Sequence, residues 1–96
     1  MLELTPVNYR KEVELSHQPV LICVHDAKSS FPEGLEQLCG TGLKCFGLDA
    51  QRYEEMAKSL RVQSLPSAIL LEKGAIVQRI RGERSLKEFA KILDLD

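Results

Sequence analysis

The sequence predicts an α/β fold in which a five-stranded mixed sheet carries helices on both faces. Apolar residues fill Val20 to Val24 without interruption, as expected of a strand that is covered on both sides. Stretches with helical periodicity alternate with strand-like stretches along the whole chain. The last two strand-like stretches are separated only by Glu72-Lys73-Gly74, which is typical of a hairpin with a tight turn.

Five segments are expected to form strands. They are residues 2–4, 20–24, 43–48, 67–71 and 75–81. Helical stretches separate the first three of these strands, so these strands are expected to pair in parallel through helical crossovers. The terminal hairpin adds two antiparallel strands. Arg79 and Arg81 suit an exposed edge strand, where charge discourages pairing with other chains.

Four segments are expected to form helices, which gives the order β-α-β-α-β-α-β-β-α. The first begins at Thr5-Pro6, a capping residue followed by proline in the first turn, and the second spans residues 31–39. A capping box formed by Ser85 and Glu88 opens the last helix. The last two helices have apolar stripes at i, i+3, i+4 and i+7, formed by Tyr53, Met56, Ala57 and Leu60 and by Leu86, Phe89, Ala90 and Leu93.

Composition restricts the classes of function. The 96 residues include 13 basic and 14 acidic ones, and this balance argues against a nucleic-acid-binding surface. The longest apolar run is far too short to cross a membrane, and the N-terminus lacks the basic and apolar regions of a signal peptide. Three cysteines, an odd number, disfavour a secreted disulfide scaffold. We therefore expect one cytoplasmic domain, residues 1–96, that binds neither nucleic acid nor membrane.

Over essentially its whole length the chain resembles the thioredoxin-like family. The order of elements, the length and the position of Pro66 carry the resemblance, and the best local match is residues 55–67. Lys73-Gly74 and Gly82 fall where the family places its hairpin turn and a glycine before the last helix. The resemblance implies a thioredoxin-like fold with a cis-proline loop at Pro66.

The resemblance also implies where an active site would lie, and the sequence departs from the family there. Family enzymes carry Cys-x-x-Cys at a helix start, where the helix dipole and free amides lower the pKa of the first thiol, and the second thiol resolves the mixed disulfide. Aligned on Ala27, this motif becomes Ser30-Phe31-Pro32-Glu33, and Ser29 replaces the usual tryptophan. Val24 stands where the family has a buried aspartate. Because the nucleophile, the resolving thiol and the proton-handling group are all replaced, no catalytic residue is expected at this site.

Two interpretations of the replaced motif remain open. Ser30 and Glu33 fit a capping box, which would convert the former active-site turn into a helix start and contribute about 0.5–2 kcal/mol. Alternatively, these two residues form a polar binding spot beside Pro66.

A peptide-binding groove is the second implication of the resemblance. In the family, the backbone before the proline pairs with an extended peptide of the partner, which assigns Ser29, Ser64, Leu65 and Pro66 to the groove. Such pairing needs no thiol. The alternative is that Pro66 only shapes the loop between a helix and a strand.

The cysteines offer a different chemistry. Cys23 lies in the apolar strand and is expected in the core. Cys39 and Cys45 are separated by five residues that include Gly40 and Gly42, so the two thiols could meet. Their spacing matches neither a redox dithiol nor a zinc site, and no metal or cofactor is expected.

Three functions therefore compete. The leading hypothesis is a redox-inactive module that binds a protein or peptide, and His25 and Asp26, near the motif, could contact such a ligand. The alternative is a divergent thiol-disulfide oxidoreductase or disulfide isomerase that uses Cys39 and Cys45. The third is a structural subunit whose edge strand or last helix forms an interface. The sequence leaves the oligomeric state open.

Overall fold

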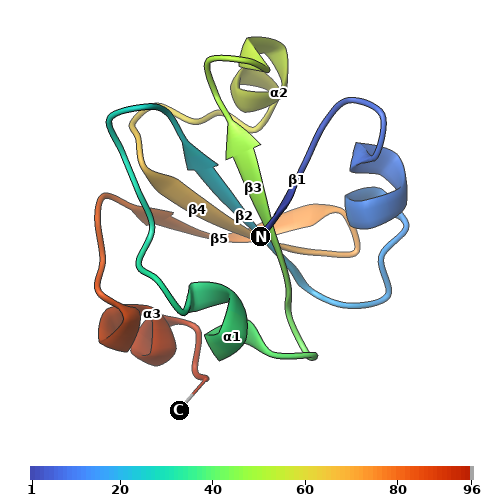
Figure 1. Cartoon of the computed structure of the whole chain (residues 1–96). Helices are drawn as coiled ribbons and strands as arrows, with labels where there is room; N and C mark the ends of the chain where they lie inside the picture. Colours follow the sequence, from blue (N-terminus) through green and yellow to red (C-terminus); the bar gives the residue numbers. More distant parts are fainter. Residues whose placement is uncertain (96) are drawn as a thin grey trace.

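The computed structural model describes residues 1–95, and its single mixed sheet confirms the predicted fold class (Figure 1). The strand order is β1-β3-β2-β4-β5, so β5 is an edge strand as expected. Strands β1 to β3 are parallel, whereas β4 runs antiparallel to β2, and β5 to β4. The strands are β1 (Leu2–Glu3), β2 (Val20–His25), β3 (Lys44–Asp49), β4 (Ser67–Glu72) and β5 (Ala75–Arg81).

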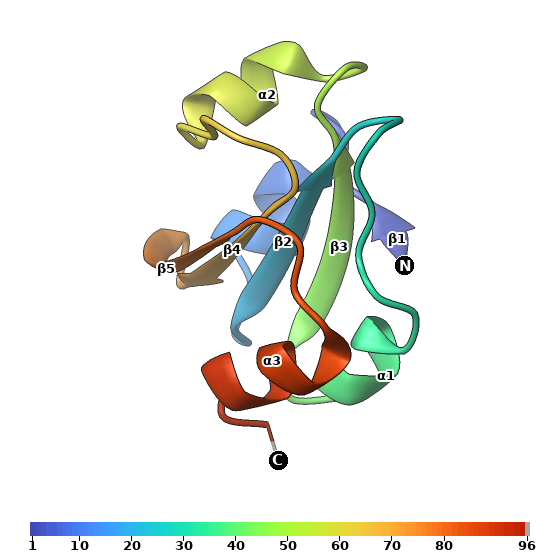
Figure 2. The same ribbon diagram turned by 90° about the vertical axis from the view of Figure 1, so that its left-hand side faces the viewer.

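Helical segments cover both faces of the sheet. They are η1 (Arg10–Glu14, a π-helical turn), α1 (Leu35–Cys39), α2 (Glu54–Ser59) and α3 (Leu86–Ile92). Helices α1 and α3 lie side by side over one face (Figures 1 and 2). Buried residues of η1 and α2 pack in a separate cluster on the opposite face.

Strand β2 explains why the core has two halves. Successive side chains of a strand point to opposite faces. Val20, Ile22 and Val24 therefore pack with η1 and α2, whereas Leu21 and Cys23 pack with α1 and α3. All five side chains are at most 1% exposed. Full burial of one such aliphatic side chain contributes about 1.5–3 kcal/mol, which explains the unbroken apolar run.

Two of the predicted helices differ from the structure. The segment expected over residues 31–39 is helical only from Leu35, because Gly34 has a left-handed φ of +88° and Pro32 disfavours a helical backbone at Phe31. The first helix is reduced to η1. Thr5 caps only the turn that precedes η1, where the Asn8 amide donates to the Thr5 hydroxyl at 3.4 Å, and η1 itself begins after Tyr9 without a side-chain cap.

The C-terminal half follows the predictions. Lys73 and Gly74, with φ of +52° and +81°, make the tight turn of the β4–β5 hairpin. Ser85 and Glu88 form the expected capping box, with both hydrogen bonds at 3.1 Å. Among the helices of residues 1–95, none is long and apolar enough to span a membrane.

Candidate functional site

The replaced motif, Ser30-Phe31-Pro32-Glu33, lies in the loop between β2 and α1. The capping-box interpretation of this segment is wrong. The N-cap of α1 is Gly34, which makes no side-chain capping bond, so Ser30 and Glu33 precede the helix instead of opening it. The four-residue motif is therefore separated from the helix dipole that would activate a thiol in an enzyme of the family.

Phe31 gives this segment a structural role. Its ring lies 6.1 Å from the ring of Phe89, centroid to centroid, with the planes tilted by 46°. Phe89 on α3 is fully buried, and Phe31 packs against the same cluster. Phe31, in the middle of the replaced motif, thus packs against the part of the core that lies under α1 and α3.

Asp26 and Ser29 fix the start of the loop. The Asp26 carboxylate accepts from the Ser29 hydroxyl at 2.8 Å and from the Lys28 amide at 3.0 Å, and the Asp26 amide donates to the Ser29 hydroxyl at 3.0 Å. The bond from the Ser29 hydroxyl, followed by the bond from the Lys28 amide, lowers the pKa of Asp26 below its usual value. The Asp-x-x-Ser pattern after a strand is the sequence signal for this turn.

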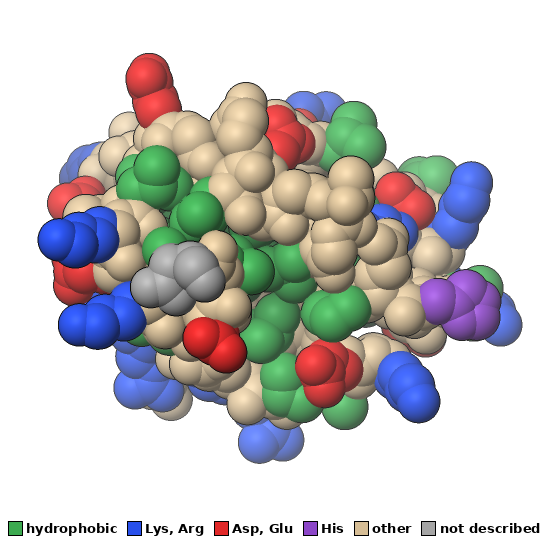
Figure 3. All heavy atoms as spheres, turned by 90° about the horizontal axis from the view of Figure 1, so that it is seen from below, with side chains coloured by type: hydrophobic (Ala, Val, Ile, Leu, Met, Phe, Trp, Pro, Cys, Tyr) green, Lys and Arg blue, Asp and Glu red, His purple; other side chains and the backbone are tan. Residues whose placement is uncertain are grey.

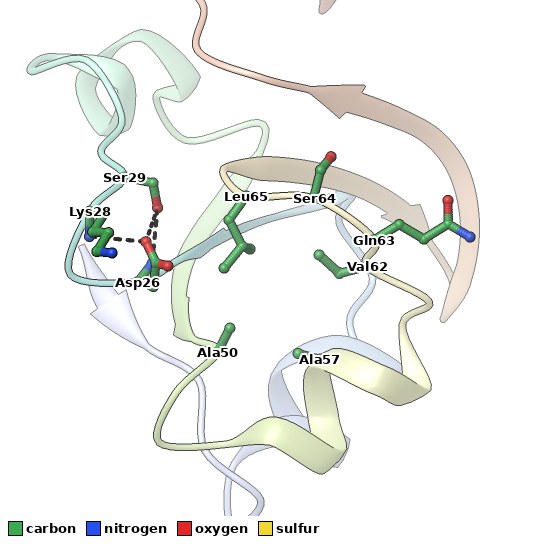
Figure 4. Close-up of a pocket in the computed structure, with 9 residues that line it drawn as sticks. All are labelled: Asp26, Lys28, Ser29, Ala50, Ala57, Val62, Gln63, Ser64 and Leu65. Atoms are coloured by element: carbon green, nitrogen blue, oxygen red, sulfur yellow. Dashed lines mark hydrogen bonds between the residues drawn. The ribbon is translucent and has the colours of Figure 1, made fainter.

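An open hollow of about 540 Å³ separates this loop from the loop after α2 (Figure 4). Three of the four predicted groove residues, Ser29, Ser64 and Leu65, line it. Pro66 is buried behind them. The remaining lining residues are Asp26, Lys28, Ala50, Ala57, Val62 and Gln63.

The floor of this hollow is apolar. Figure 4 shows the side chains of Ala50, Ala57 and Leu65 pointing toward the same space, and Gln63 extending away from it. No cysteine or histidine is among the lining residues. The hollow can therefore bind a side chain, but it contains no thiol or imidazole for nucleophilic chemistry.

The backbone at the rim has free hydrogen-bonding capacity. Within residues 1–95, the Leu65 amide and carbonyl make no hydrogen bond to other protein groups. On either side, the Ser64 carbonyl accepts from the Ser67 hydroxyl at 2.7 Å and the Pro66 carbonyl from the Gly82 amide at 2.9 Å. The Leu65–Pro66 peptide bond is cis.

A second hollow of about 440 Å³ lies on the other side of the β2–α1 loop. Ser29 borders both hollows, whereas Ser30 and Phe31 line only the second one. Ser30 and Glu33 therefore do not lie in the hollow beside Leu65. His25, which the sequence placed near the motif, also lines the second hollow.

The three cysteines are free thiols, and they pack in the same cluster, with Cys39 on α1 itself. Cys23 is 1% exposed, as expected for a core residue. A hydrogen bond with Cys23, together with burial, raises the pKa of Cys45 to about 12. A hydrogen bond with Cys45, followed by burial, raises the pKa of Cys39. Protonated thiols are poor nucleophiles, so the proposed Cys39–Cys45 chemistry lacks an activated thiolate.

Cys39 also borders a smaller apolar hollow of about 270 Å³ near the C-terminus. Figure 3 shows hydrophobic side chains gathered on this face of the molecule. The lining residues are Pro19, Cys39, Gly42, Leu43, Leu70, Glu72, Leu93 and Leu95. No group of three His, Cys, Asp or Glu side chains in the described part of the chain is arranged to hold a metal ion.

Solved structures with the same fold define the class of protein. The solution structure of the thioredoxin-like domain of Arabidopsis NCP (nuclear control of PEP activity) matches with a TM-score of 0.80 and 26% identity, over 95% of this chain and 72% of that one. The crystal structure of ERdj5 form I matches with a TM-score of 0.80 and 18% identity, over 97% of this chain and 14% of that one. No protein-family model matches the sequence, and no curated protein matches it at a significant level.

The protein is thus a divergent domain of thioredoxin-like fold that lacks the Cys-x-x-Cys motif. One fold of this kind serves many unrelated functions.

Proposed function

We propose that the protein is a redox-inactive thioredoxin-like module that binds an extended segment of a protein partner in the hollow beside Leu65. The observation that carries the proposal is the unpaired Leu65 backbone at the rim of an apolar hollow. An extended peptide can use one such residue for a pair of backbone hydrogen bonds, and it gains specificity from a side chain placed in a neighbouring pocket.

The lining of the hollow indicates the chemistry of that segment. Ala50, Ala57 and Leu65 form a small apolar floor, which suits an apolar side chain of the partner. Asp26 lies at the rim, and its lowered pKa keeps it ionised at neutral pH. A basic residue next to the apolar one would complement this carboxylate.

The same residues argue against catalysis in this hollow. The Ser29 hydroxyl donates to the Asp26 carboxylate and accepts from the Asp26 amide, so its single proton is held within the loop. The lining offers no histidine to act as the base for Ser29 and no thiol to act as a nucleophile.

The binding test is a selection from a phage-displayed library of random peptides. Ala50→Trp places a large side chain in the hollow and serves for counter-selection. The fold should be retained, because the backbone amide at position 50 keeps its bond to the His25 carbonyl at 2.9 Å. Ala27→Trp is the matched control, since Ala27 is exposed and does not line the hollow. Selected peptides are expected to bind wild type and Ala27→Trp alike and Ala50→Trp at least about tenfold more weakly, a difference of about 1.4 kcal/mol.

Amide exchange locates the bound peptide. The Leu65 amide should gain protection when a selected peptide is added. Peptides that bind Ala50→Trp as well as wild type, or protection confined to another face, would contradict the proposal.

Redox inactivity has its own assay. Reduction of insulin by dithiothreitol should proceed no faster with the protein than without it. If the protein accelerates the reaction and Cys39→Ser with Cys45→Ser abolishes the effect, the oxidoreductase alternative is correct instead.

A further inference from the structure

Two arginines from distant parts of the sequence meet beside the hollow next to Leu65. Arg61 directly precedes Val62 and Gln63, which line that hollow. The Arg79 guanidinium on β5 donates to the Arg61 carbonyl at 3.4 Å. Edge strand β5 is therefore joined to the loop that follows α2, and the two arginines are neighbours on the surface.

Arg81 lies on the same face of β5 as Arg79. Successive strand residues alternate between the two faces of a sheet, and directly opposite residues of paired strands share a face. Arg79 is opposite Ile69, which packs in the cluster that contains residues of η1 and α2. Arg81 is opposite Ser67, whose hydroxyl donates to the Ser64 carbonyl at the rim of the hollow at 2.7 Å. Both arginines therefore belong to the face of the sheet that carries the hollow.

The arginine cluster, defined as Arg61, Arg79 and Arg81, has no carboxylate partner of its own. Arg61 and Arg81 are exposed, and Arg79 is partly buried. None of the three takes part in an ion pair within residues 1–95, whereas neighbouring Arg84 lies 3.7 Å from Glu88. Guanidinium groups form strong paired hydrogen bonds with carboxylates. The cluster therefore fits a partner with acidic side chains.

The Leu65 backbone sets the direction of a bound segment. One residue exchanges both of its backbone hydrogen bonds with a single opposite residue only in antiparallel pairing. In the described part of the chain the Leu65 amide and carbonyl are both free, so the segment should run opposite to the chain from Arg61 to Leu65. Figure 4 shows Asp26 and Gln63 on opposite sides of the hollow. A segment that enters beside Asp26 therefore leaves toward the arginine cluster.

We propose that the arginine cluster binds an acidic stretch of the same partner segment, which then carries, from its N-terminus, a basic, an apolar and an acidic part. The basic part lies at Asp26, the apolar side chain lies in the hollow, and the acidic part lies at the cluster. Arg61 is four residues from Leu65 in the chain, a span of at most about 14 Å. The acidic residues are expected about two to four positions after the apolar one. This inference rests on the proposed peptide-binding function and adds the order of charges in the partner.

The test compares peptide selections on three forms of the full-length protein, each with the same phage-displayed library of random peptides. They are wild type, a variant with Arg79→Gln and Arg81→Gln, and a matched control with Lys87→Gln and Lys91→Gln on the exposed surface of α3. Each double variant loses two positive charges and keeps long polar side chains. Peptides selected on wild type and on the lysine control should be enriched in Asp and Glu after the apolar residue. Peptides selected on the arginine variant should lack this enrichment.

The affinity of a fluorescein-labelled peptide selected on wild type measures the size of the effect. The double arginine variant should bind it about fivefold more weakly, because two exposed charge pairs are lost. The difference should disappear at about 1 M salt, where the screening length is about 3 Å. Arg61→Gln, which leaves β5 unchanged, should weaken binding by about twofold.

The outcomes separate this inference from the proposed function. Peptides that bind Ala50→Trp weakly but show no acidic enrichment, or that bind the arginine variant as tightly as wild type, would overturn the inference and leave the proposed function intact. Acidic residues enriched before the apolar one, or an equal loss in the lysine control, would also overturn it. If no selected peptide distinguishes Ala50→Trp from wild type, both proposals are wrong.

Discussion

The contact between Phe31 and Phe89 predicts that the replaced motif now stabilises the fold. Phe89 is fully buried, and replacing such a residue with alanine costs about 3–5 kcal/mol. A domain of this size has a total stability of about 5–15 kcal/mol, so Phe89→Leu is the safer variant if Phe89→Ala does not fold. Phe31 is only partly buried, and Phe31→Ala should cost about 1–2 kcal/mol.

A double-mutant cycle separates the aromatic contact from general burial. The ring separation of 6.1 Å falls in the range where aromatic pairs contribute about 0.5–1.5 kcal/mol beyond their buried area. The cost of Phe31→Ala should therefore shrink by about that amount when Phe89 is also replaced. Phe46 provides the control, because it is buried in the cluster on the opposite face of the sheet and should be additive with Phe31.

Urea unfolding followed by far-ultraviolet circular dichroism is the suitable assay, since the chain contains no tryptophan. With a slope of about 1–3 kcal/mol per molar urea, the loss in Phe31→Ala should shift the midpoint by about 1 M. The reasoning is refuted if Phe31→Ala leaves the midpoint unchanged, or if its coupling to Phe89 is no larger than its coupling to Phe46.

Four further predictions concern caps and turns. Ser85→Ala should lower stability by about 1 kcal/mol in urea unfolding, because it removes the cap of α3. The Ser85 backbone amide, followed by the Ser85 side chain, lowers the pKa of Glu88, so the Glu88 carboxylate stabilises the fold above its ordinary pKa of about 4.3 and loses this effect as the pH falls through its lower folded value. Glu88→Gln should therefore be less stable than wild type at neutral pH and approach it below about pH 3 in urea unfolding, and a difference that does not shrink would contradict this. Gly74→Ala should cost about 1 kcal/mol at its φ of +81°, and an unchanged melting temperature would show that the turn tolerates a side chain. Ser29→Ala should speed exchange of the Asp26 amide about tenfold by removing its acceptor, which is checked by NMR against the exchange rate of amides in β2.

The sequence by itself determined the elements that depend on local patterns. The apolar run of β2, the hairpin turn at Lys73-Gly74 and the capping box at Ser85 each follow from residues within a few positions of one another. The replacement of Cys-x-x-Cys was equally visible, since it needs only residue identities at Ser30 and Glu33. Periodicity and capping are local effects, and the strand, turn and cap could therefore be predicted without the fold.

The tertiary structure alone decided which surfaces and side chains meet. The left-handed Gly34 delays α1 until Leu35, and the packing of Phe31 against Phe89 draws the former motif toward the core. The free backbone of Leu65 is visible only once its neighbours' hydrogen bonds are known. The sulfur of Cys45 lies close to the sulfurs of Cys23 and Met1, which are 22 and 44 positions away in the sequence. This contact depends on the order of strands in the sheet, a long-range arrangement that no local spacing encodes.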